Sequence, residues 1–373
     1  MDKLSVDVLV IGGGIAGASV AANLTSKTKV VVVEAEEHPG FHSTGRSVAV
    51  YAPMYGSKVI RDITAMSSPL FKKAEDELSQ AILSQRGFLF IAKKHQHQAM
   101  NNLRKELSKL SNLTHMNIEE AQKLVPAIKS QYVSEALFDP DAKDIDVSTL
   151  HHYYINQLRA CGGKILLSQR VKKIEQIGSH YEVVCDTVTI FCNKIVNAAG
   201  AWADEIGQLA GCKKLGLKPL RRTAFSFEPD NWDYKDWPVV IDCEEEFYIK
   251  PETGSIIGSP ADETEDIPRD VYAEEIDIAI GMDRITAALD FKVKSIQSSW
   301  AGLRTFTPDR DPVVGFDKKH KNFFWLAGQG GYGIQTAPYL GKLSSDLILG
   351  NTYSQTTEDS ELITALSPNR FNK

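Results

Sequence analysis

The residues near the N-terminus whose types and spacing could do chemistry are three glycines and one acid. Gly12, Gly14 and Gly17 form a GxGxxG motif, and Glu34 follows 22 residues after the first glycine. In such a motif the first glycine allows a tight turn, the second lets a pyrophosphate approach the backbone, and the third lets a helix pack closely on a strand. A carboxylate at the place of Glu34 can accept hydrogen bonds from both ribose hydroxyls, which disfavours NADP. The motif predicts a dinucleotide site and leaves FAD and NAD open.

Two short apolar runs must position this motif. Residues 8–11, which are Val, Leu and Ile, precede the glycines, and residues 30–33, which are all Val, precede Glu34. Fully apolar, β-branched runs are typical of strands buried on both faces of a parallel sheet. Residues 18–24 between them are mostly small or apolar, as in a helix packed on such a sheet, and the helix N-terminus attracts phosphate. The segment therefore predicts a strand–helix–strand unit of the Rossmann type.

A polar stretch follows Glu34 where an NAD-binding fold would return to another strand and helix. Residues 35–47 contain glycine, hydroxyl side chains and Arg46, and they indicate a loop that extends along a longer cofactor. Arg46 is a suitable phosphate partner, and the hydroxyls can donate hydrogen bonds to phosphate or ribitol oxygens. For these residues alone, a solvated surface loop is the alternative.

Eight segments, in the same order along the chain, resemble the D-amino acid oxidase superfamily of FAD enzymes, and within it the bacterial D-arginine dehydrogenases. The segments are residues 12–17 with Glu34, 41–47, 144–146, 196–204, 221–222, 258–261, 300–304 and 329–336. The resemblance implies an α/β fold of the glutathione-reductase-like, D-amino acid oxidase type. A Rossmann-like FAD-binding domain (1–47, 141–213 and 299–373) would be interleaved with an antiparallel-sheet capping domain (48–140 and 214–298).

Patterns elsewhere in the chain agree with these expectations. Residues 323–327 are an apolar run that indicates a buried strand, and four glycines follow before an apolar stretch from Ile334 that indicates a helix. A glycine loop between a strand and a helix N-terminus can bind an anion or an oxygen atom. Residues 196–200 indicate a strand that ends in a turn of small residues. Residues 223–227 and 247–250 indicate strands of the capping domain.

The resemblance also implies which residues hold the cofactor. Some relatives attach FAD through a cysteine before the C-terminal glycine loop, but this chain has no cysteine after Cys243, so non-covalent FAD is expected. The implied cofactor contacts are Gly12, Gly14, Ile15, Ala16, Gly17, Glu34, Ala35, Ser43, Thr44, Arg46, Ser47, Val171, Ala199, Gly200, Trp202, Gly302, Gly328, Gly331, Gly333, Ile334, Gln335 and Thr336.

Enzymes of this superfamily oxidise a C–N bond next to a carboxylate, and arginine binds a carboxylate best. Arg222 and Arg304 match the carboxylate-binding arginines of the family, Tyr248 matches a tyrosine that contacts the same carboxylate, and Tyr55 matches a tyrosine on a mobile lid. The alternative is a surface ion pair for each arginine and a core position for each tyrosine. Neighbours in a strand point to opposite faces, so only one of Arg221 and Arg222 should enter the site.

Four further positions concern the substrate pocket. Gly331 and Gln335 match positions where the glycine loop touches substrate or flavin. The D-arginine enzymes have a glutamate that pairs with the cationic side chain, but it aligns with Phe88 here, and a nearby histidine aligns with Val50. Burying a cationic head group without a partner is costly. The chain is therefore expected to prefer a substrate with a neutral or hydrophobic side chain over D-arginine or D-lysine.

The resemblance implies an FAD-dependent D-amino acid dehydrogenase or oxidase. A hydride would pass from Cα of the neutral amine to flavin N5, and the imino acid would hydrolyse to a 2-oxo acid and ammonia. A 2-hydroxy acid, glycine, sarcosine or a cyclic imino acid is the first alternative, because an arginine pair serves any carboxylate. A non-catalytic flavin-binding assembly factor is the second. A quinone, a dye-like carrier and O2 all stay open as electron acceptor.

Composition excludes several other classes of protein. The chain has 373 residues and a net charge of −6, with no long basic run, which argues against nucleic acid as a partner. The five cysteines are scattered and no metal-ligand spacing occurs, so reduced thiols, a cytoplasmic location and no metal are expected. The sequence contains no stretch of about 18 apolar residues, so no transmembrane helix is expected. A peripheral contact with a membrane surface stays open.

Overall fold

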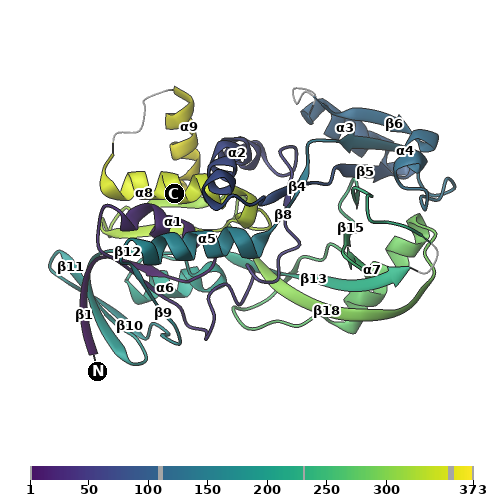
Figure 1. Ribbon diagram of the computed structural model, residues 1–373. Helices are drawn as coiled ribbons and strands as arrows, with labels where there is room; N and C mark the ends of the chain where they lie inside the picture. Colours follow the sequence, from purple (N-terminus) through teal and green to yellow (C-terminus); the bar gives the residue numbers. More distant parts are fainter. Residues whose placement is uncertain (1, 108–111, 230–231, 352–356, 372–373) are drawn as a thin grey trace.

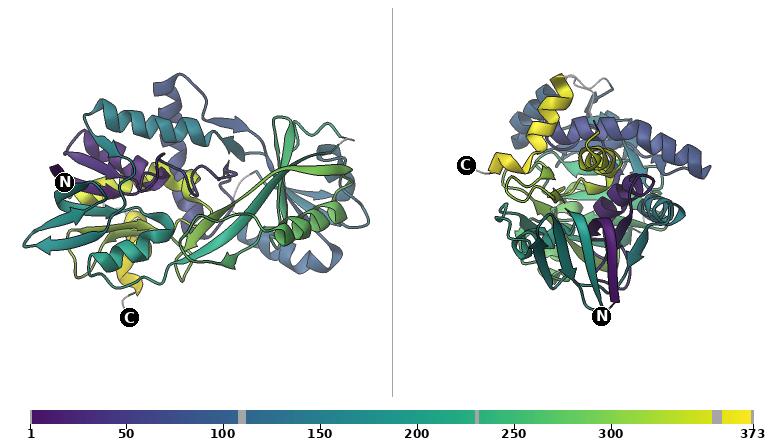
Figure 2. Two further views of the ribbon diagram at one scale, coloured as in Figure 1. Left: turned by 90° about the horizontal axis from the view of Figure 1, so that it is seen from below. Right: turned by 90° about the vertical axis from the view of Figure 1, so that its left-hand side faces the viewer.

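The computed structural model describes residues 2–107, 112–229, 232–351 and 357–371. Residues 1 and 372–373, the ends of the expected FAD-binding segments, and residues 108–111 and 230–231 of the expected capping segments lie outside the described part, as do residues 352–356. The chain forms two lobes, each built on one large sheet (Figures 1 and 2). Long strands run from the junction into the second lobe.

The first lobe contains an eight-stranded sheet with helices on its faces. Its strands are β1 (Asp2–Ile11), β2 (Val30–Val33), β9 (Lys164–Leu166), β10 (Lys173–Ile177), β11 (His180–Val184), β12 (Val188–Asn197), β19 (Val313–Phe316) and β20 (Phe323–Ala327). Its helices are α1 (Ile15–Thr25), α5 (Val147–Ala160), η2 (Gly200–Trp202), α6 (Ala203–Leu209), α8 (Gly333–Leu349), α9 (Thr357–Leu366) and η3 (Pro368–Phe371). β20, β12, β1, β2 and β9 are parallel, which is the Rossmann-like core that the sequence predicts.

The central strands of this sheet are buried on both faces, which explains their continuous apolar runs. Val8 and Val10 of β1 pack with residues of α1 and α8, whereas Leu9 and Ile11 pack with residues of α6 on the opposite face. Between β1 and α1 the chain turns at Gly12, whose φ is +107°. A Cβ atom on Gly17 would lie 1.9 Å from the Gly12 carbonyl oxygen, so only glycine allows this close approach of helix and turn.

The second lobe contains a nine-stranded sheet. Its strands are β5 (Phe88–Ala92), β6 (Thr114–Asn117), β7 (Glu135–Asp139), β13 (Lys218–Pro229), β14 (Val239–Asp242), β15 (Tyr248–Glu252), β16 (Ser255–Ser259), β17 (Thr264–Glu265) and β18 (Val293–Phe306). The helices of this lobe are η1 (Lys94–Gln96), α3 (His97–Leu107), α4 (Ile118–Leu124) and α7 (Glu275–Ala288). Apart from the parallel pair β5–β14, the pairings are antiparallel, as expected for a capping domain.

Alternation along these strands gives the capping sheet two different faces. Phe225 of β13 and Ile249 of β15 pack in a core with Ile285 of α7. Residues of the opposite parity, such as Ala224 and Tyr248, face the first lobe and line a cavity. The period of two therefore places one set of side chains in the core and the other set in the site.

Three elements at the junction show how the lobes are interleaved. A small sheet of β3 (Val50–Tyr51), β8 (Lys143–Ile145) and β4 (Leu83–Gln85) connects the lobes, and α2 (Lys58–Leu78) packs against α8. α2 thus lies on the first lobe although its residues are in an expected capping segment. β18 pairs with β13 over most of its length and continues past the expected boundary at residue 299. Among the described residues, no helix is long and apolar enough to cross a membrane.

Candidate active site

A large cavity lies between the two sheets, with a volume of about 1500 Å³ when the space at its mouth is counted. Its wall comes from the start of α1, the loop at residues 43–50, the inner face of the capping sheet and the glycine loop before α8. Four of the lining residues are cationic, namely Arg46, Arg222, Lys250 and Arg304, and none is His, Asp or Glu. Unlike the other three, Arg304 has no ion pair among the described residues, so its part of the wall is suited to bind an anionic group.

The structure brings most of the expected cofactor residues to this cavity. Those that line it are Gly14, Ile15, Ala16, Ser43, Thr44, Arg46, Ser47, Gly200, Gly302, Gly331, Gly333, Ile334 and Gln335. Those outside its wall are Gly12, Gly17, Glu34, Ala35, Val171, Ala199, Trp202, Gly328 and Thr336. Trp202 instead lines a smaller hollow with Phe41 and His42, and Val171 is buried in the core of the first lobe.

Glu34 lies beside the glycine turn, at the end of β2. Its Oε2 atom accepts a hydrogen bond from the Gly13 N–H at 2.7 Å, and its Oε1 atom accepts one from the Glu36 N–H at 3.0 Å. These two bonds fix the carboxylate at the carboxyl end of the sheet, where a parallel α/β fold binds nucleotides.

The Arg46 guanidinium is engaged with groups of the second lobe, and the expected contact with a phosphate stays a prediction. Its Nη1 atom donates to the carbonyl oxygens of Val271 and Ala301, each at 2.9 Å, and its Nη2 atom lies 2.5 Å from a carboxylate oxygen of Asp270. The guanidinium therefore ties the loop of the first lobe to the second lobe. Sequence spacing could not show this, because all three partners are more than 200 residues away.

The two adjacent arginines of β13 point to opposite sides, as strand alternation predicts. Arg221 pairs with Glu274 and Asp277 of the α7 region, whereas Arg222 lines the cavity. The Arg222 Nε atom donates to the Asp262 carbonyl oxygen at 2.8 Å, and its Nη2 atom lies 3.4 Å from Glu263 Oε1. Burial and the nearby charge of Arg304 lower the pKa of Arg222 from its usual value.

Arg304 is the second cavity arginine, and it comes from β18. In the part of the chain that the structure describes, no carboxylate lies within ion-pair distance of its guanidinium. The rings of Phe306 and Tyr332 lie 5.8 and 6.0 Å from it. A Cβ atom on Gly331 would lie 1.4 Å from Arg304 Nη2, so the guanidinium rests directly on the glycine loop. Burial opposes the charge, but the tyrosines around the group raise the pKa of Arg304, which stays cationic.

Aromatic side chains close the cavity around these arginines. The ring of Tyr55 lies 5.9 Å from that of Phe88 and 5.3 Å from that of Tyr332. The Tyr55 hydroxyl donates a hydrogen bond to Glu245 Oε2 at 2.8 Å. Burial, reinforced by Glu245, raises the pKa of Tyr55 well above its usual value. Tyr248 also lines the cavity, so the four expected catalytic residues share one wall.

Several residues of the site were not predicted from the sequence, among them Lys250, Tyr332 and Glu245. Lys250 lines the cavity from β15, two residues after Tyr248, and the period of two could have revealed it. Tyr332 lies within the glycine motif itself and also lines the cavity. Glu245 lies in a turn with φ of +58° and reaches Tyr55 across 190 residues of sequence, and nothing in the spacing indicates that contact.

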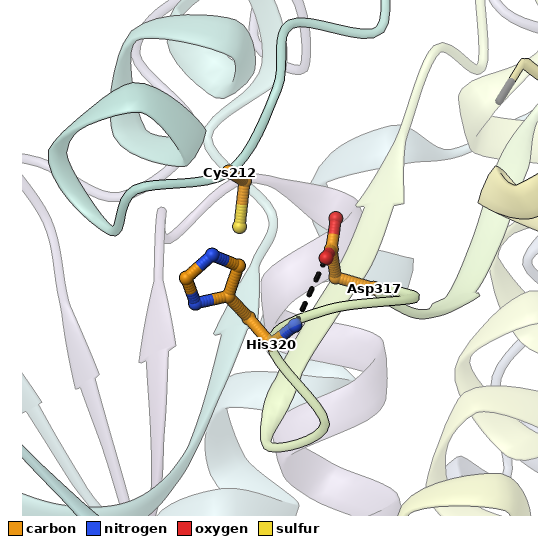
Figure 3. Close-up of side chains that lie close together, drawn as sticks. All are labelled: Cys212, Asp317 and His320. Atoms are coloured by element: carbon orange, nitrogen blue, oxygen red, sulfur yellow. Dashed lines mark hydrogen bonds between the residues drawn. The ribbon is translucent and has the colours of Figure 1, made fainter.

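A cluster of Cys212, Asp317 and His320 lies away from the cavity, with possible ligand atoms within 4.8 Å of one another (Figure 3). The Asp317 Oδ1 atom accepts hydrogen bonds from the backbone N–H groups of Lys319 and His320, and its Oδ2 atom accepts one from the Trp325 indole at 3.3 Å. Burial and the nearby Asp317 raise the pKa of Cys212, which stays a thiol. These bonds explain the cluster as a hydrogen-bonded turn.

Comparisons with known proteins agree with this fold. The family model described as FAD dependent oxidoreductase matches residues 7–347. The chain belongs to this FAD-dependent oxidoreductase family. As an FAD-dependent oxidoreductase it has the D-amino acid oxidase-type fold that its sequence predicts, whereas the narrower likeness to D-arginine dehydrogenases stays a prediction.

Individual relatives of this oxidoreductase are distant. FAD-dependent oxidoreductase domain-containing protein 1 of Xenopus laevis is 24% identical over 92% of the chain and 79% of its own length. Human mitochondrial dimethylglycine dehydrogenase is 25% identical over the whole chain, which spans only 45% of that protein. The crystal structure of L-proline dehydrogenase from P. horikoshii superposes with a TM-score of 0.85 at 23% identity, over 100% of this chain and 99% of that one.

FAD, the cofactor of this family, fits the residues of the cavity. Gly14, Ile15 and Ala16 present the N-terminus of α1 to it, and an N-terminus with free N–H groups binds phosphate. A Cβ atom on Gly12 would lie 2.4 Å from the Ala198 carbonyl oxygen, so the turn beneath this site requires glycine. Glu34 stands at the adjacent strand end. The wall then continues to the glycine loop and the arginines, which gives a long cofactor room to reach the substrate end.

Proposed function

We propose that this oxidoreductase uses FAD to oxidise a D-amino acid with a neutral side chain, hydrophobic ones included, to an imino acid that hydrolyses to a 2-oxo acid and ammonia. The observation that carries the proposal is the pair Arg222 and Arg304 in the wall of the cofactor cavity, of which Arg222 is buried and Arg304 half-buried. Arg304 has no carboxylate partner among the described residues. A buried cation without a partner is costly unless a ligand supplies the charge.

The arginines and Tyr248 bind and orient the substrate carboxylate. Arginine can pair with a carboxylate through two parallel hydrogen bonds, which fixes the position of the adjacent Cα atom. Such positioning is worth several powers of ten in rate because the reacting groups no longer lose orientational freedom. Tyr55, which bridges to Glu245, covers the site and limits the entry of water.

The lining residues include no acid or histidine that could remove the amine proton. The substrate amine must therefore enter in its neutral form, and the chain contributes orientation and charge complementarity instead of a general base. The residues of the cavity would position the Cα hydrogen, and FAD bound there would supply a hydride acceptor at its N5 atom.

Apolar residues that pack beside Tyr55 and Tyr248 favour a substrate with a neutral side chain. Val50, Phe88, Val239 and Ile241 line this part of the cavity. None offers a counter-charge for the head group of D-arginine or D-lysine, whose burial without a partner is costly. These positions support a preference for neutral D-amino acids.

Oxidation of a secondary amine or a cyclic imino acid is the second candidate. Two similar proteins are named dimethylglycine dehydrogenase and L-proline dehydrogenase, and the same arginine pair would bind the carboxylate of either type of substrate. A 2-hydroxy acid could use that pair too, but no other feature of the cavity favours it.

Anaerobic reduction of the bound flavin by a substrate panel tests the proposal. The panel contains D- and L-amino acids, glycine, sarcosine, dimethylglycine, L-proline and 2-hydroxy acids, and loss of the oxidised flavin absorbance is recorded. Fastest reduction by neutral D-amino acids is expected. Fastest reduction by sarcosine or L-proline would favour the second candidate, and reduction by 2-hydroxy acids alone would contradict both.

A further inference from the structure

Lys250 is a charged residue in the part of the cavity that Val50, Phe88 and Val239 line, which we call the side-chain end. Val240 of β14 pairs with Ile249 of β15, so the next residues, Val239 and Lys250, are neighbours on the cavity face. Val239 is in turn paired with Phe88 of β5. Lys250 is 5% exposed and lines the cavity. A buried ammonium group therefore stands beside the residues that define the side-chain end of the site.

The charge of Lys250 is balanced by carboxylates outside the cavity wall. Its Nζ atom donates a hydrogen bond to Glu252 Oε1 at 2.6 Å and lies 3.3 Å from Asp144 Oδ1. Asp144 also accepts a hydrogen bond from Arg86 Nε at 2.7 Å. Two cations and two carboxylates make up this group, so its formal charge is zero. An added charged head group would have no counter-charge here, whereas a neutral polar group needs none.

The hydrogen bonds of the group are incomplete. An ammonium has three N–H donors, and in the described part of the chain only Glu252 accepts one from Lys250 with hydrogen-bond geometry. Asp144 Oδ1 is buried with no hydrogen-bond partner. Asp144 is paired in register with Val50, another residue of the side-chain end. A buried donor without an acceptor destabilises the protein, and a ligand that supplies the acceptor removes this cost.

We propose that Lys250 donates a hydrogen bond to a neutral oxygen at the end of the substrate side chain, so that D-amino acids with an amide or hydroxyl group are preferred. This inference rests on the proposed function and narrows it. The apolar neighbours Val50, Phe88 and Val239 accommodate the carbon chain, and Lys250 selects the group at its end. A carboxylate end would add one negative charge to a neutral buried cluster and is selected against.

Matched substrates test the inference. D-Glutamine is compared with D-methionine and D-glutamate, and D-threonine with D-valine, by kcat/KM and by the rate of anaerobic flavin reduction. D-Glutamine should exceed D-methionine and D-glutamate by about 10- to 100-fold, the range expected for a hydrogen bond to a charged donor. The kcat/KM for D-threonine should exceed that for D-valine if the shorter side chain also reaches Lys250. Equal values for these two substrates, together with a preference for D-glutamine, would assign the contact to the longer amide.

The variant Lys250→Met assigns the effect to this side chain. The ratio of D-glutamine to D-methionine should fall to about 1, because the stem remains and the donor is lost. The control is Lys194→Met, which removes a half-buried lysine that donates to the Ile348 carbonyl oxygen in the first lobe and should leave the ratio unchanged. If Lys250→Met does not fold, Lys250→Gln, which keeps a neutral donor, should retain part of the preference.

Three results would overturn the inference. A kcat/KM for D-methionine equal to or above that for D-glutamine in the unaltered protein would show that no polar group is recognised. An unchanged ratio of D-glutamine to D-methionine in Lys250→Met would show that Lys250 is not responsible. D-Glutamate above D-glutamine would show recognition of charge. Each leaves the proposed function intact, because D-amino acids would still reduce the flavin. Failure of every D-amino acid to reduce the flavin would overturn the proposed function and this inference together.

Discussion

Arg304 is the residue whose surroundings indicate a ligand most directly. Its side chain is half-buried, rests on Gly331 and has no carboxylate partner in the described part of the chain. Arg221, by contrast, is satisfied by Glu274 and Asp277. Arginines of the second kind contribute to the structure, whereas an arginine of the first kind is retained at an energetic cost that a bound carboxylate offsets.

Replacing Arg304 should separate substrate binding from cofactor binding. In Arg304→Met we expect kcat/KM for the best substrate to fall about 100-fold or more, which is about 2.7 kcal/mol of transition-state stabilisation. The FAD content, measured by absorbance after denaturation, should be unchanged. Arg221→Met is the matched control, since its side chain faces α7, and its kcat/KM should stay within about twofold. An equal loss in both variants would show that the effect is structural.

The pH dependence should follow the substrate and not the cavity. Burial raises the pKa of Tyr55 well above 10, so its hydroxyl remains a donor across the alkaline range. We expect kcat/KM to rise with pH as the substrate amine loses its proton and then to stay level up to about pH 10. A substrate with a less basic amine should shift the rising limb by the difference in amine pKa. A decline between about pH 8 and pH 10 would contradict this.

Residues of the site that are placed by local backbone geometry could be predicted from the sequence, whereas residues placed by tertiary contacts could not. The opposite directions of Arg221 and Arg222 follow from strand alternation, and the same rule applied to Tyr248 would have found Lys250. The partners of Arg46 could not be predicted, because Ala301, Asp270 and Val271 reach it only through tertiary folding. Tertiary contacts of that kind have no signature in sequence spacing.

Among the elements, the glycine loop between β20 and α8 has the most demanding geometry. Gly331 allows the Arg304 guanidinium to lie where a Cβ atom would otherwise stand. β20 was predicted within its bounds from its apolar run, and the helix after the glycines was expected to begin at Ile334, one residue after the observed start of α8 at Gly333. Why the loop contains glycine at residue 331 becomes clear only from β18, which brings Arg304 to it.

Gly331→Ala tests this contact between two elements. The added methyl group should displace the Arg304 guanidinium, so we expect a loss of kcat/KM comparable to that of Arg304→Met. Combined in one chain, the two substitutions should cost little more than either alone, because both remove the same interaction. The measurement is a double-mutant cycle on kcat/KM. Additive losses would mean that Gly331 acts on something other than Arg304.

At the scale of the whole molecule, the cavity joins two lobes whose segments alternate along the chain. The hydrophobic patterns predicted the parallel sheet and several capping strands, but they could not place the boundary near residue 299. β18 pairs with β13 across that boundary, and its pattern does not change where it passes from one lobe toward the other. Likewise α2 packs on α8 of the first lobe, although its residues lie within the expected capping segment 48–140. Such positions depend on packing partners that are distant in sequence.

Because FAD would bind along the whole cavity, we expect both halves of the cofactor to stabilise the protein. We expect FAD at about 100 times its dissociation constant to raise the free energy of unfolding of the apoprotein by about 2.7 kcal/mol. FMN lacks the adenylate half that the glycine turn and Glu34 would bind, and at the same concentration it should raise the thermal midpoint much less. Equal stabilisation by FAD and FMN would contradict the role assigned to Gly12, Gly14, Gly17 and Glu34.

We propose that the cavity presents the Cα–H bond of a carboxylate-anchored D-amino acid to FAD. The most direct test mixes the protein with one equivalent of a neutral D-amino acid without oxygen and measures both the flavin absorbance and the 2-oxo acid formed. We predict full loss of the oxidised flavin spectrum with one equivalent of 2-oxo acid, and no change with the L-enantiomer. An unchanged flavin spectrum with every D-amino acid, or flavin reduction without a 2-oxo acid, would contradict the account.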